Sequence, residues 1–151
     1  MLAYGGGSIK KSGLYDEVVK ILEDNDIFYK ELAGIEPNPR VDSAREGVKI
    51  VRENNLDFIL AVGGGSVIDL SKLVAGAVYL DCDPWDIVIK KAKIEKALPI
   101  GTILTLAATG SEMDAGGVIT NLETNQKLGF GSAYTSKVFN IESRDNLFCK
   151  C

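Results

Sequence analysis

Residues 60–72 decide the fold that we expect for this chain, and they read Leu60-Ala61-Val62-Gly63-Gly64-Gly65-Ser66-Val67-Ile68-Asp69-Leu70-Ser71-Lys72. The apolar run over residues 57–62 lacks polar alternation, which is typical of a central parallel strand covered on both faces. Three glycines then allow a sharp turn and a close approach of the backbone to a ligand. Ser66 is a candidate N-cap for the helix that follows. Because free N–H groups at a helix N-terminus point back over such a loop, the pattern favours a phosphate site over a plain turn.

Composition narrows the class of protein. The chain has 151 residues, of which 46% are hydrophobic, and a net charge of −4. We therefore expect one folded domain over residues 1–151. The chain has no Lys/Arg run and no apolar stretch of membrane-spanning length, so we expect neither nucleic acid nor a membrane as partner. It contains no histidine, which excludes a Ser–His or Cys–His catalytic pair within these residues.

The cysteines point to a reducing compartment. Cys82, Cys149 and Cys151 are odd in number, and two of them stand at the very end, so they do not form a paired disulfide framework. A cytoplasmic location is therefore expected. Cys149 and Cys151 could also be half of a metal site, but this alternative lacks a second cysteine pair or any histidine.

Strand and helix patterns alternate along the chain. Apolar spacing predicts helices from Leu14 to near Asn25-Asp26, from Asp42 or Ser43 to Asn54-Asn55, over 66–79 and over 85–89. Residues 1–4 look too short for a full strand. Strands are expected at 27–32, 57–62, 98–104 and 138–141, and a two-strand hairpin at 116–120 and 127–130. The pattern predicts an α/β, Rossmann-like, mainly parallel sheet flanked by helices, with a small antiparallel hairpin.

Three loops follow predicted strands and should meet at one edge of the sheet, namely residues 5–8, 63–66 and 105–114. The tetrad Gly-Gly-Gly-Ser occurs in the first two, whereas the dinucleotide fingerprint G-x-G-x-x-G is absent from both. Lys10 and Lys11 follow the first tetrad without a nearby acidic residue, so we expect a 2′-phosphate there and NADP(H) as cofactor. The alternative is that both lysines are solvated helix-surface charges.

Four motifs, at residues 4–11, 36–39, 61–69 and 108–112, stand in the order found in a known family. With them the chain resembles the nucleotide-binding domain of the iron-containing (group III) alcohol dehydrogenases, and most of all their NADPH-dependent butanol dehydrogenase-like branch. The resemblance implies hydride transfer between a nicotinamide cofactor and a small-molecule alcohol or aldehyde. It also implies an Fe²⁺ or Zn²⁺ ion in a full-length parent, held by one Asp and three His of an all-helical domain.

The same resemblance implies roles for ten residues in cofactor binding. The adenosine ribose and its 2′-phosphate would lie by Gly6, Gly7 and Ser8. The pyrophosphate would lie by Gly64, Gly65 and Ser66. The nicotinamide end would lie near Asp69, and the ribose and phosphates would be contacted by Thr105, Thr109 and Lys127.

The chain also differs from the family, and these differences lead us to expect no catalytic activity from these residues alone. The all-helical metal domain is absent from these residues, and relative to the family we expect the chain to be truncated at both ends. We therefore expect no metal ligands and no catalytic residue here, an inactive fragment, and a possible homodimer. One alternative is a stand-alone nucleotide-binding module that needs a partner chain. Another is a domain like those of glycerol dehydrogenase or dehydroquinate synthase.

Overall fold

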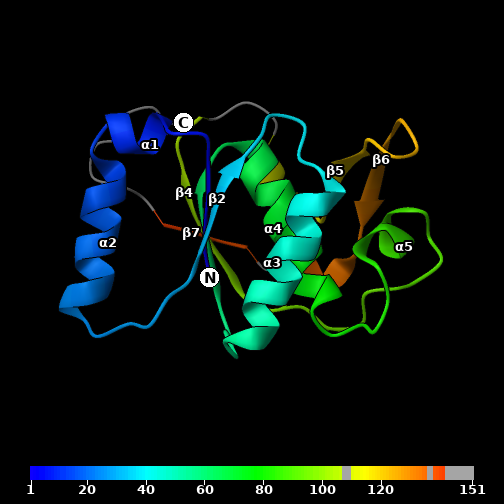
Figure 1. The fold of residues 1–151 in the computed structure, drawn as a ribbon, viewed down its shortest axis with the longest axis horizontal. Coiled ribbons are helices and arrows are strands. Elements are labelled where there is room, and N and C mark those ends of the chain that lie inside the picture. Colours follow the sequence, from blue (N-terminus) through cyan, green and yellow to red (C-terminus); the bar gives the residue numbers. More distant parts are fainter. Residues whose placement is uncertain (107–109, 136–137, 142–151) are drawn as a thin grey trace.

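The computed structural model describes residues 1–106, 110–135 and 138–141 (Figure 1). Thr109, Cys149 and Cys151 lie outside these residues. A five-stranded parallel sheet forms the centre, and a two-stranded antiparallel sheet lies beside it, which confirms the predicted fold class. In spatial order the parallel strands are β2 (Glu31–Ile35), β1 (Leu2–Gly5), β3 (Ile59–Gly63), β4 (Ile100–Leu104) and β7 (Val138–Asn140). The antiparallel pair is β5 (Gly116–Asn121) and β6 (Gln126–Gly131).

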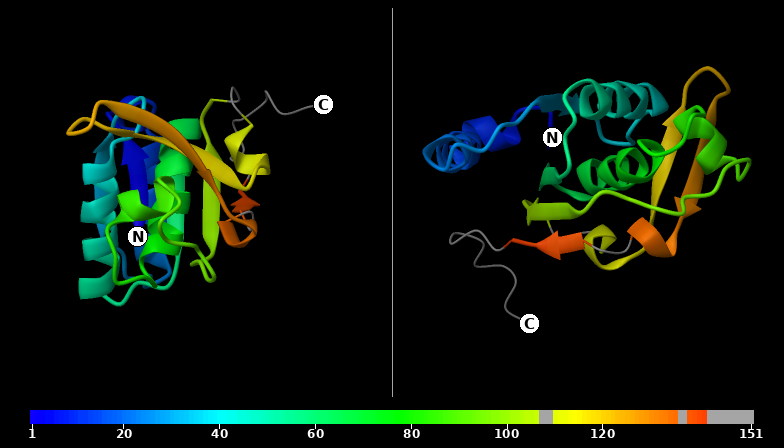
Figure 2. Two further views of the ribbon diagram at one scale, coloured as in Figure 1. Left: turned by 90° about the vertical axis from the view of Figure 1, so that its right-hand side faces the viewer. Right: turned by 90° about the horizontal axis from the view of Figure 1, so that it is seen from below.

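Helices cover both faces of the parallel sheet (Figures 1 and 2). One face carries α1 (Ser8–Lys11) and α2 (Leu14–Asp24), and the other carries α3 (Val41–Glu53) and α4 (Gly65–Ala77). The short helix α5 (Pro84–Val88) packs near α3 and α4, and two 3₁₀ turns, η1 (Ser111–Met113) and η2 (Ala133–Thr135), flank the hairpin. In the described part of the chain, no helix has the length and apolar character needed to cross a membrane.

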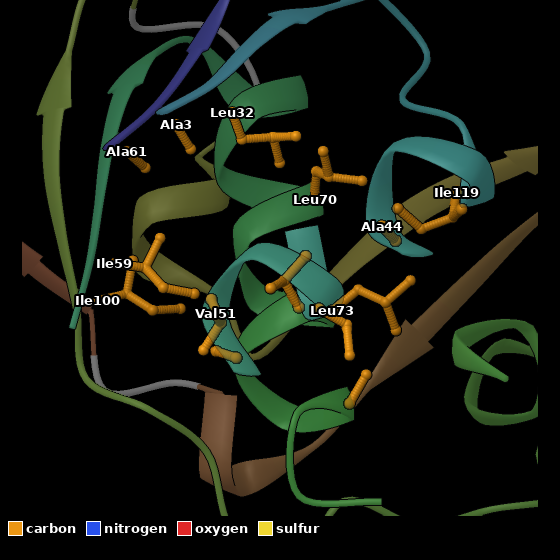
Figure 3. Packing of buried hydrophobic residues seen from close by; sticks show 14 of the residues in the cluster. Ala3, Leu32, Ala44, Val51, Ile59, Ala61, Leu70, Leu73, Ile100 and Ile119 are labelled. Carbon is orange, nitrogen blue, oxygen red and sulfur yellow. The ribbon is translucent and has the colours of Figure 1, made fainter. Parts of the chain in front are cut away.

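Side chains of the strands alternate between two cores, as a period of two residues requires. On the α2 side, Tyr4 and Val62 pack with Val18 of α2. On the opposite side, Ala61 and Ile100 belong to the larger cluster with α3 and α4, part of which is shown in Figure 3. Helix α4 is the most deeply placed element, because Val67, Ile68 and all residues from 70 to 77 are buried. Its thorough burial explains why apolar and small residues surround most of it, apart from the side that carries Asp69 and Lys72.

Two strand predictions need correction. The strand expected at residues 27–32 is wrong in its bounds, since β2 begins only at Glu31 and runs to Ile35. Asp26 turns the chain after α2 with a φ of 53°, and Ile27 and Phe28 are then 50% and 66% exposed. The stretch at residues 1–4, which looked too short for a full strand, contributes Leu2 to Tyr4 to β1 (Leu2–Gly5), and β2 and β3 pair with this strand on its two edges.

The expected N-caps are also wrong. Helix α3 begins at Val41 after an extended Arg40, so Asp42 and Ser43 lie inside its first turn. Helix α4 begins at Gly65 after an extended Gly64, and Ser66 lies within the helix. The observed N-cap residues, Arg40 and Gly64, make no side-chain capping hydrogen bond. The N-cap of α4 is thus Gly64, two residues before the expected Ser66.

The strand order places a crevice at one point of the sheet. From β1 the chain moves outward to β2 and then returns to the other side of β1 to form β3. The loops after β1 and β3 therefore leave the sheet toward opposite faces, and the gap between them is where open α/β sheets bind ligands. The glycine tetrads at residues 5–8 and 63–66 follow these two strands.

Close packing of α3 on α4 predicts the effect of one substitution. A methyl group at Gly47 would lie 2.8 Å from Val74 Cγ2 and 3.0 Å from Leu32 Cδ2. Gly→Ala inside a helix ordinarily stabilises by about 1 kcal/mol, but overpacking of this kind destabilises by about 1–3 kcal/mol. We expect Gly47→Ala to lower the free energy of unfolding, as measured by urea denaturation.

The control is the same substitution in a Val74→Ala background, which removes the Val74 contacts and leaves only the flexible end of Leu32 close to the new methyl group. There Gly47→Ala should become neutral or stabilising. An increase in stability in the wild-type background would contradict the packing described.

Candidate functional site

Two clefts meet at the N-terminus of α4. The first, which we call the glycine cleft, has a volume of about 760 Å³ and is lined by residues that include Gly5, Gly6, Ser8, Gly63, Gly64, Gly65, Ser66 and Thr105. The second, which we call the hairpin cleft, has a volume of about 500 Å³ and is lined by residues that include Asn38, Asp69, Ser111, Asp114, Gly117 and Lys127. Gly65 and Ser66 line both clefts. A ligand that crosses this helix terminus can therefore occupy both.

The glycines of the two tetrads differ in whether the fold itself requires them. Gly7 has a φ of 132°, a backbone conformation that residues with a side chain rarely adopt, so this position favours glycine. Gly63 is required because Val67 Cγ2 would lie 2.6 Å from an added Cβ. At Gly6, by contrast, an added Cβ would meet nothing within 4 Å, and at Gly64 it would meet only Leu106 at van der Waals distance. Such open glycines fit a ligand that approaches the backbone closely.

The first turn of α4 has the polarity that suits an anion. The Gly64 carbonyl accepts the N–H groups of Val67 and Ile68. By helix geometry, the N–H groups of Gly65 and Ser66 have no acceptor within the helix. No acidic residue stands in this first turn. The helix dipole and these N–H groups together favour bound phosphate at the point shared by both clefts.

The hairpin cleft contains several charged and polar groups, and its wall is held by side chains of α4. Asp69 Oδ1 accepts a hydrogen bond from the Ser111 hydroxyl, and Asp69 Oδ2 accepts one from the Val118 N–H at 2.9 Å. Gly117 lies directly over Asp69, since an added Cβ would be 2.9 Å from Asp69 Cβ. On the other side, Lys127 Nζ donates to Asn38 Oδ1. The cleft thus combines carboxylates, a hydroxyl and a lysine within reach of one ligand.

The structure brings most of the predicted site residues together. The glycine cleft is lined by Gly6, Ser8, Gly64, Gly65, Ser66 and Thr105, and the hairpin cleft also by Asp69 and Lys127. Gly7 is not among the described residues that line either cleft, and its positive φ shapes the turn instead. Thr109 lies outside the described residues.

Lys10, one of the two lysines that suggested a 2′-phosphate, lies over two aromatic rings in the structure. Its Nζ is 4.6 Å from the ring centroid of Tyr15 and 5.3 Å from that of Tyr4. Both tyrosine hydroxyls donate to Glu31, at 2.7 Å from Tyr15 and 2.5 Å from Tyr4. Neither Lys10 nor Lys11 is among the described residues that line the glycine cleft. An anion at the first tetrad would therefore meet Ser8 before it met Lys10.

The pKa values of this cluster reflect the same contacts. Burial raises the pKa of Glu31, but the hydrogen bonds from Tyr4 and Tyr15 and the nearby Lys10 lower it more, so that it lies below its usual range. The hydrogen bond to Glu31, followed by burial, raises the pKa of Tyr15 to about 12. The carboxylate is therefore ionised near neutral pH and holds the two phenols as donors, which fixes α2 against β1 and β2.

Sequence reasoning missed the cation beneath the hairpin cleft. Lys72 is fully buried, and its Nζ lies 2.6 Å from Asp114 Oδ1. Burial raises the pKa of Asp114, but the hydrogen bonds from Lys72 and from the Gly116 N–H lower it more, to below its usual range. A signal was present in the sequence, because Lys72 stands alone among the apolar and small residues of α4 and one turn after Asp69.

Metal binding has no support from side chains in the described ranges. No group of three or more Cys, Asp or Glu side chains that could hold a metal ion occurs there. The described residues thus offer no ligand set for the iron or zinc that the resemblance implies for a full-length parent.

Comparisons with known proteins match this reading of the fold. The family model for iron-containing alcohol dehydrogenase matches residues 1–139. The chain is 56% identical over 131 residues to NADH-dependent butanol dehydrogenase A of Clostridium acetobutylicum, which covers 87% of this chain and 34% of that protein. It is 45% identical over 144 residues to the NADPH-dependent aldehyde reductase YqhD of Escherichia coli, with 93% of this chain and 37% of that protein covered.

Solved structures agree with the sequence relatives. The crystal structure of NADH-dependent butanol dehydrogenase A from Thermotoga maritima superposes with a TM-score of 0.89 at 44% identity, over 93% of this chain and 36% of that one. The chain thus spans about a third of the length of the relatives it matches (34% of the first curated one). The matching region is an N-terminal part of these proteins.

The ion pair between Lys72 and Asp114 predicts a pH dependence of stability. Because the pKa of Asp114 is lowered on folding, its contribution is present above the unfolded pKa of about 3.9 and is lost as the pH falls through the folded value. The Asp114 side chain is 58% exposed, so screening limits the effect to about 1 kcal/mol. At pH 7, Asp114→Asn should lower the free energy of urea unfolding by about this amount.

As the pH falls from the unfolded pKa through the lowered folded pKa, the gap between Asp114→Asn and wild type should shrink, and it should close once Asp114 is neutral in both states. Glu46→Gln, at an exposed position of α3, serves as control and should show no comparable gap. A difference for Asp114→Asn that persists unchanged at pH 3 would contradict the electrostatic origin.

Proposed function

Because the chain belongs to the iron-containing alcohol dehydrogenase family, we propose that it binds a nicotinamide dinucleotide as the cofactor-binding part of an alcohol dehydrogenase or aldehyde reductase. The observation that carries this proposal is the pair of clefts that share Gly65 and Ser66 at the N-terminus of α4. A dinucleotide has two halves joined by a pyrophosphate, and this site has two hollows joined by an anion-binding helix end.

Each part of the ligand has a place in this proposal. The pyrophosphate lies on the Gly64–Ser66 turn, the adenosine half enters the glycine cleft, and the nicotinamide half enters the hairpin cleft. When bound, the nicotinamide supplies the hydride chemistry. The chain's own residues bind and orient it: backbone N–H groups of α4 hold the phosphates, and the wall around Asp69 limits the space beside the ring.

NADP(H) is the cofactor form that we propose. Residues 5–13 contain no acidic residue, whereas a loop that binds free ribose hydroxyls usually offers them a carboxylate. The carboxylate of Glu17, which also lines the glycine cleft, belongs to α2 and not to this loop. Ser8 lines the cleft and offers a hydroxyl to a 2′-phosphate. The names of the relatives include both forms, since the Clostridium protein is NADH-dependent and the Escherichia protein NADPH-dependent. The proposal therefore depends on Ser8 and on the lack of acidic residues in the loop itself, and not on Lys10.

The substrate class follows from the same family. The relatives are named for butanol and for aldehydes, so we propose a primary alcohol or aldehyde for the whole protein. The metal ligands that the family resemblance implies would come from outside the residues described, either from further chain or from a partner that supplies them.

Titration calorimetry with NADPH and NADH tests the cofactor assignment. We expect NADPH to bind more tightly, and Ser8→Ala to weaken NADPH binding about ten-fold or more, because a hydrogen bond to a charged group contributes about 1.5–3 kcal/mol. NADH binding to the same variant should hardly change and serves as the control. Tighter binding of NADH to the wild type would refute the choice of NADP(H), and binding of neither would refute the proposed function.

An activity assay tests the division of roles. With butanal, NADPH and added Fe²⁺ or Zn²⁺, we expect the purified chain to leave the NADPH absorbance unchanged. Steady oxidation of NADPH by this chain alone would show that it holds a complete catalytic site. Turnover that begins only when a second chain with metal ligands is added would favour the partner-dependent module.

A further inference from the structure

Lys72 is an unusual residue for its position. It lies in the middle of α4 with 0% of its surface exposed, beside the buried Ser71 and Leu73. Burial of an ammonium group is costly unless hydrogen-bond acceptors replace its water. Neither the sequence pattern nor the proposed contacts of the cofactor explain why a lysine stands here instead of another apolar side chain.

The acceptors all come from one short segment. Lys72 Nζ lies 2.5 Å from the carbonyl oxygen of Ser111, 2.8 Å from those of Asp114 and Gly116, and 2.6 Å from Asp114 Oδ1. Residues 111–116 thus wrap around a single cation. The Met113 N–H donates to the carbonyl of Gly110, the residue just before this segment. The Gly116 N–H donates to Asp114 Oδ1. Lys72 is therefore the centre that gives the segment its shape.

Asp69 ties the same segment to α4 from the other side. It accepts from Ser111 and from the Val118 N–H, so it holds the first residue of the segment and the strand that follows it. Because Asp69 and Lys72 are three residues apart, they lie on the same side of the helix. The two side chains, one negative and one positive, fix both ends of the segment to one helix.

This segment is also the wall of the hairpin cleft. Ser111, Asp114 and Gly116 line that cleft, whereas Lys72 is not among the described residues that line either cleft. The lysine is thus behind the wall and does not reach a ligand. The glycine cleft shares no residue with the segment.

We propose that Lys72 is a positioning residue, which holds residues 111–116 in the shape that receives the nicotinamide half of the dinucleotide. The inference rests on the proposed function and adds to it the residue that preforms one half of the site. Loss of Lys72 should loosen the hairpin cleft and leave the glycine cleft intact. The two halves of the cofactor should therefore respond differently to its replacement.

The test compares a half-cofactor with the whole one. Binding of adenosine 2′,5′-bisphosphate and of NADPH is measured by calorimetry for the wild type and for Lys72→Met, with AMP and NADH as a parallel pair. We expect Lys72→Met to bind the adenosine half as the wild type does, and to lose about ten-fold or more of its affinity for the whole dinucleotide. A merely structural role would weaken both ligands together.

Asp114→Asn is the second variant, in case Lys72→Met does not fold. Its largely exposed side chain keeps the Oδ1 acceptor but loses the charge, so we expect a smaller loss in the same direction, of a few-fold, for the whole dinucleotide alone. Variants that bind both ligands like the wild type, or that lose both equally, would overturn the role of Lys72. A wild type that binds neither the half nor the whole cofactor would instead overturn the proposed function, and this inference with it.

Discussion

The buried helix α4 is the element on which the rest of the structure depends. It lies between the parallel sheet, α3 and the β5–β6 hairpin, and residues of all three pack against it. Its entry from β3 is possible only because Gly63 has no side chain where Val67 folds back. Since α4 cannot shift without disturbing each of these contacts, its N-terminus is a rigid point on an otherwise open edge of the sheet.

This one helix serves both halves of the candidate site in different ways. At its N-terminus it offers backbone N–H groups to an anion, as helix ends commonly do. One and two turns further along, Asp69 and Lys72 hold the wall of the hairpin cleft. The proposed phosphate site and the wall of the hairpin cleft thereby belong to the same helix. A ligand that spans both clefts meets a site that is largely formed before it binds.

Much of this could be predicted from the sequence, because it depends on local patterns. The helix at residues 14–24 and the hairpin follow from apolar spacing and turn residues, and the glycine tetrads mark the loops of the crevice. The strand at 27–32 was wrong because the turn at Asp26 is followed by exposed apolar side chains, which imitate a strand pattern. Lys72 was missed because its partners lie about 40 residues away in the chain, as the separations of 39 to 44 residues show. Such long-range contacts leave no periodic signal.

The central claim is that the two clefts form one dinucleotide site joined at Gly65 and Ser66. It is tested most directly by recording amide chemical shifts of the ¹⁵N-labelled chain during titration with NADPH. The account predicts that the amides of Ser8, Ser66 and Val118, one from the glycine cleft, one from the shared helix end and one from the hairpin, shift together with a single midpoint. Separate midpoints for Ser8 and Val118, or a Ser66 amide that does not respond, would contradict it.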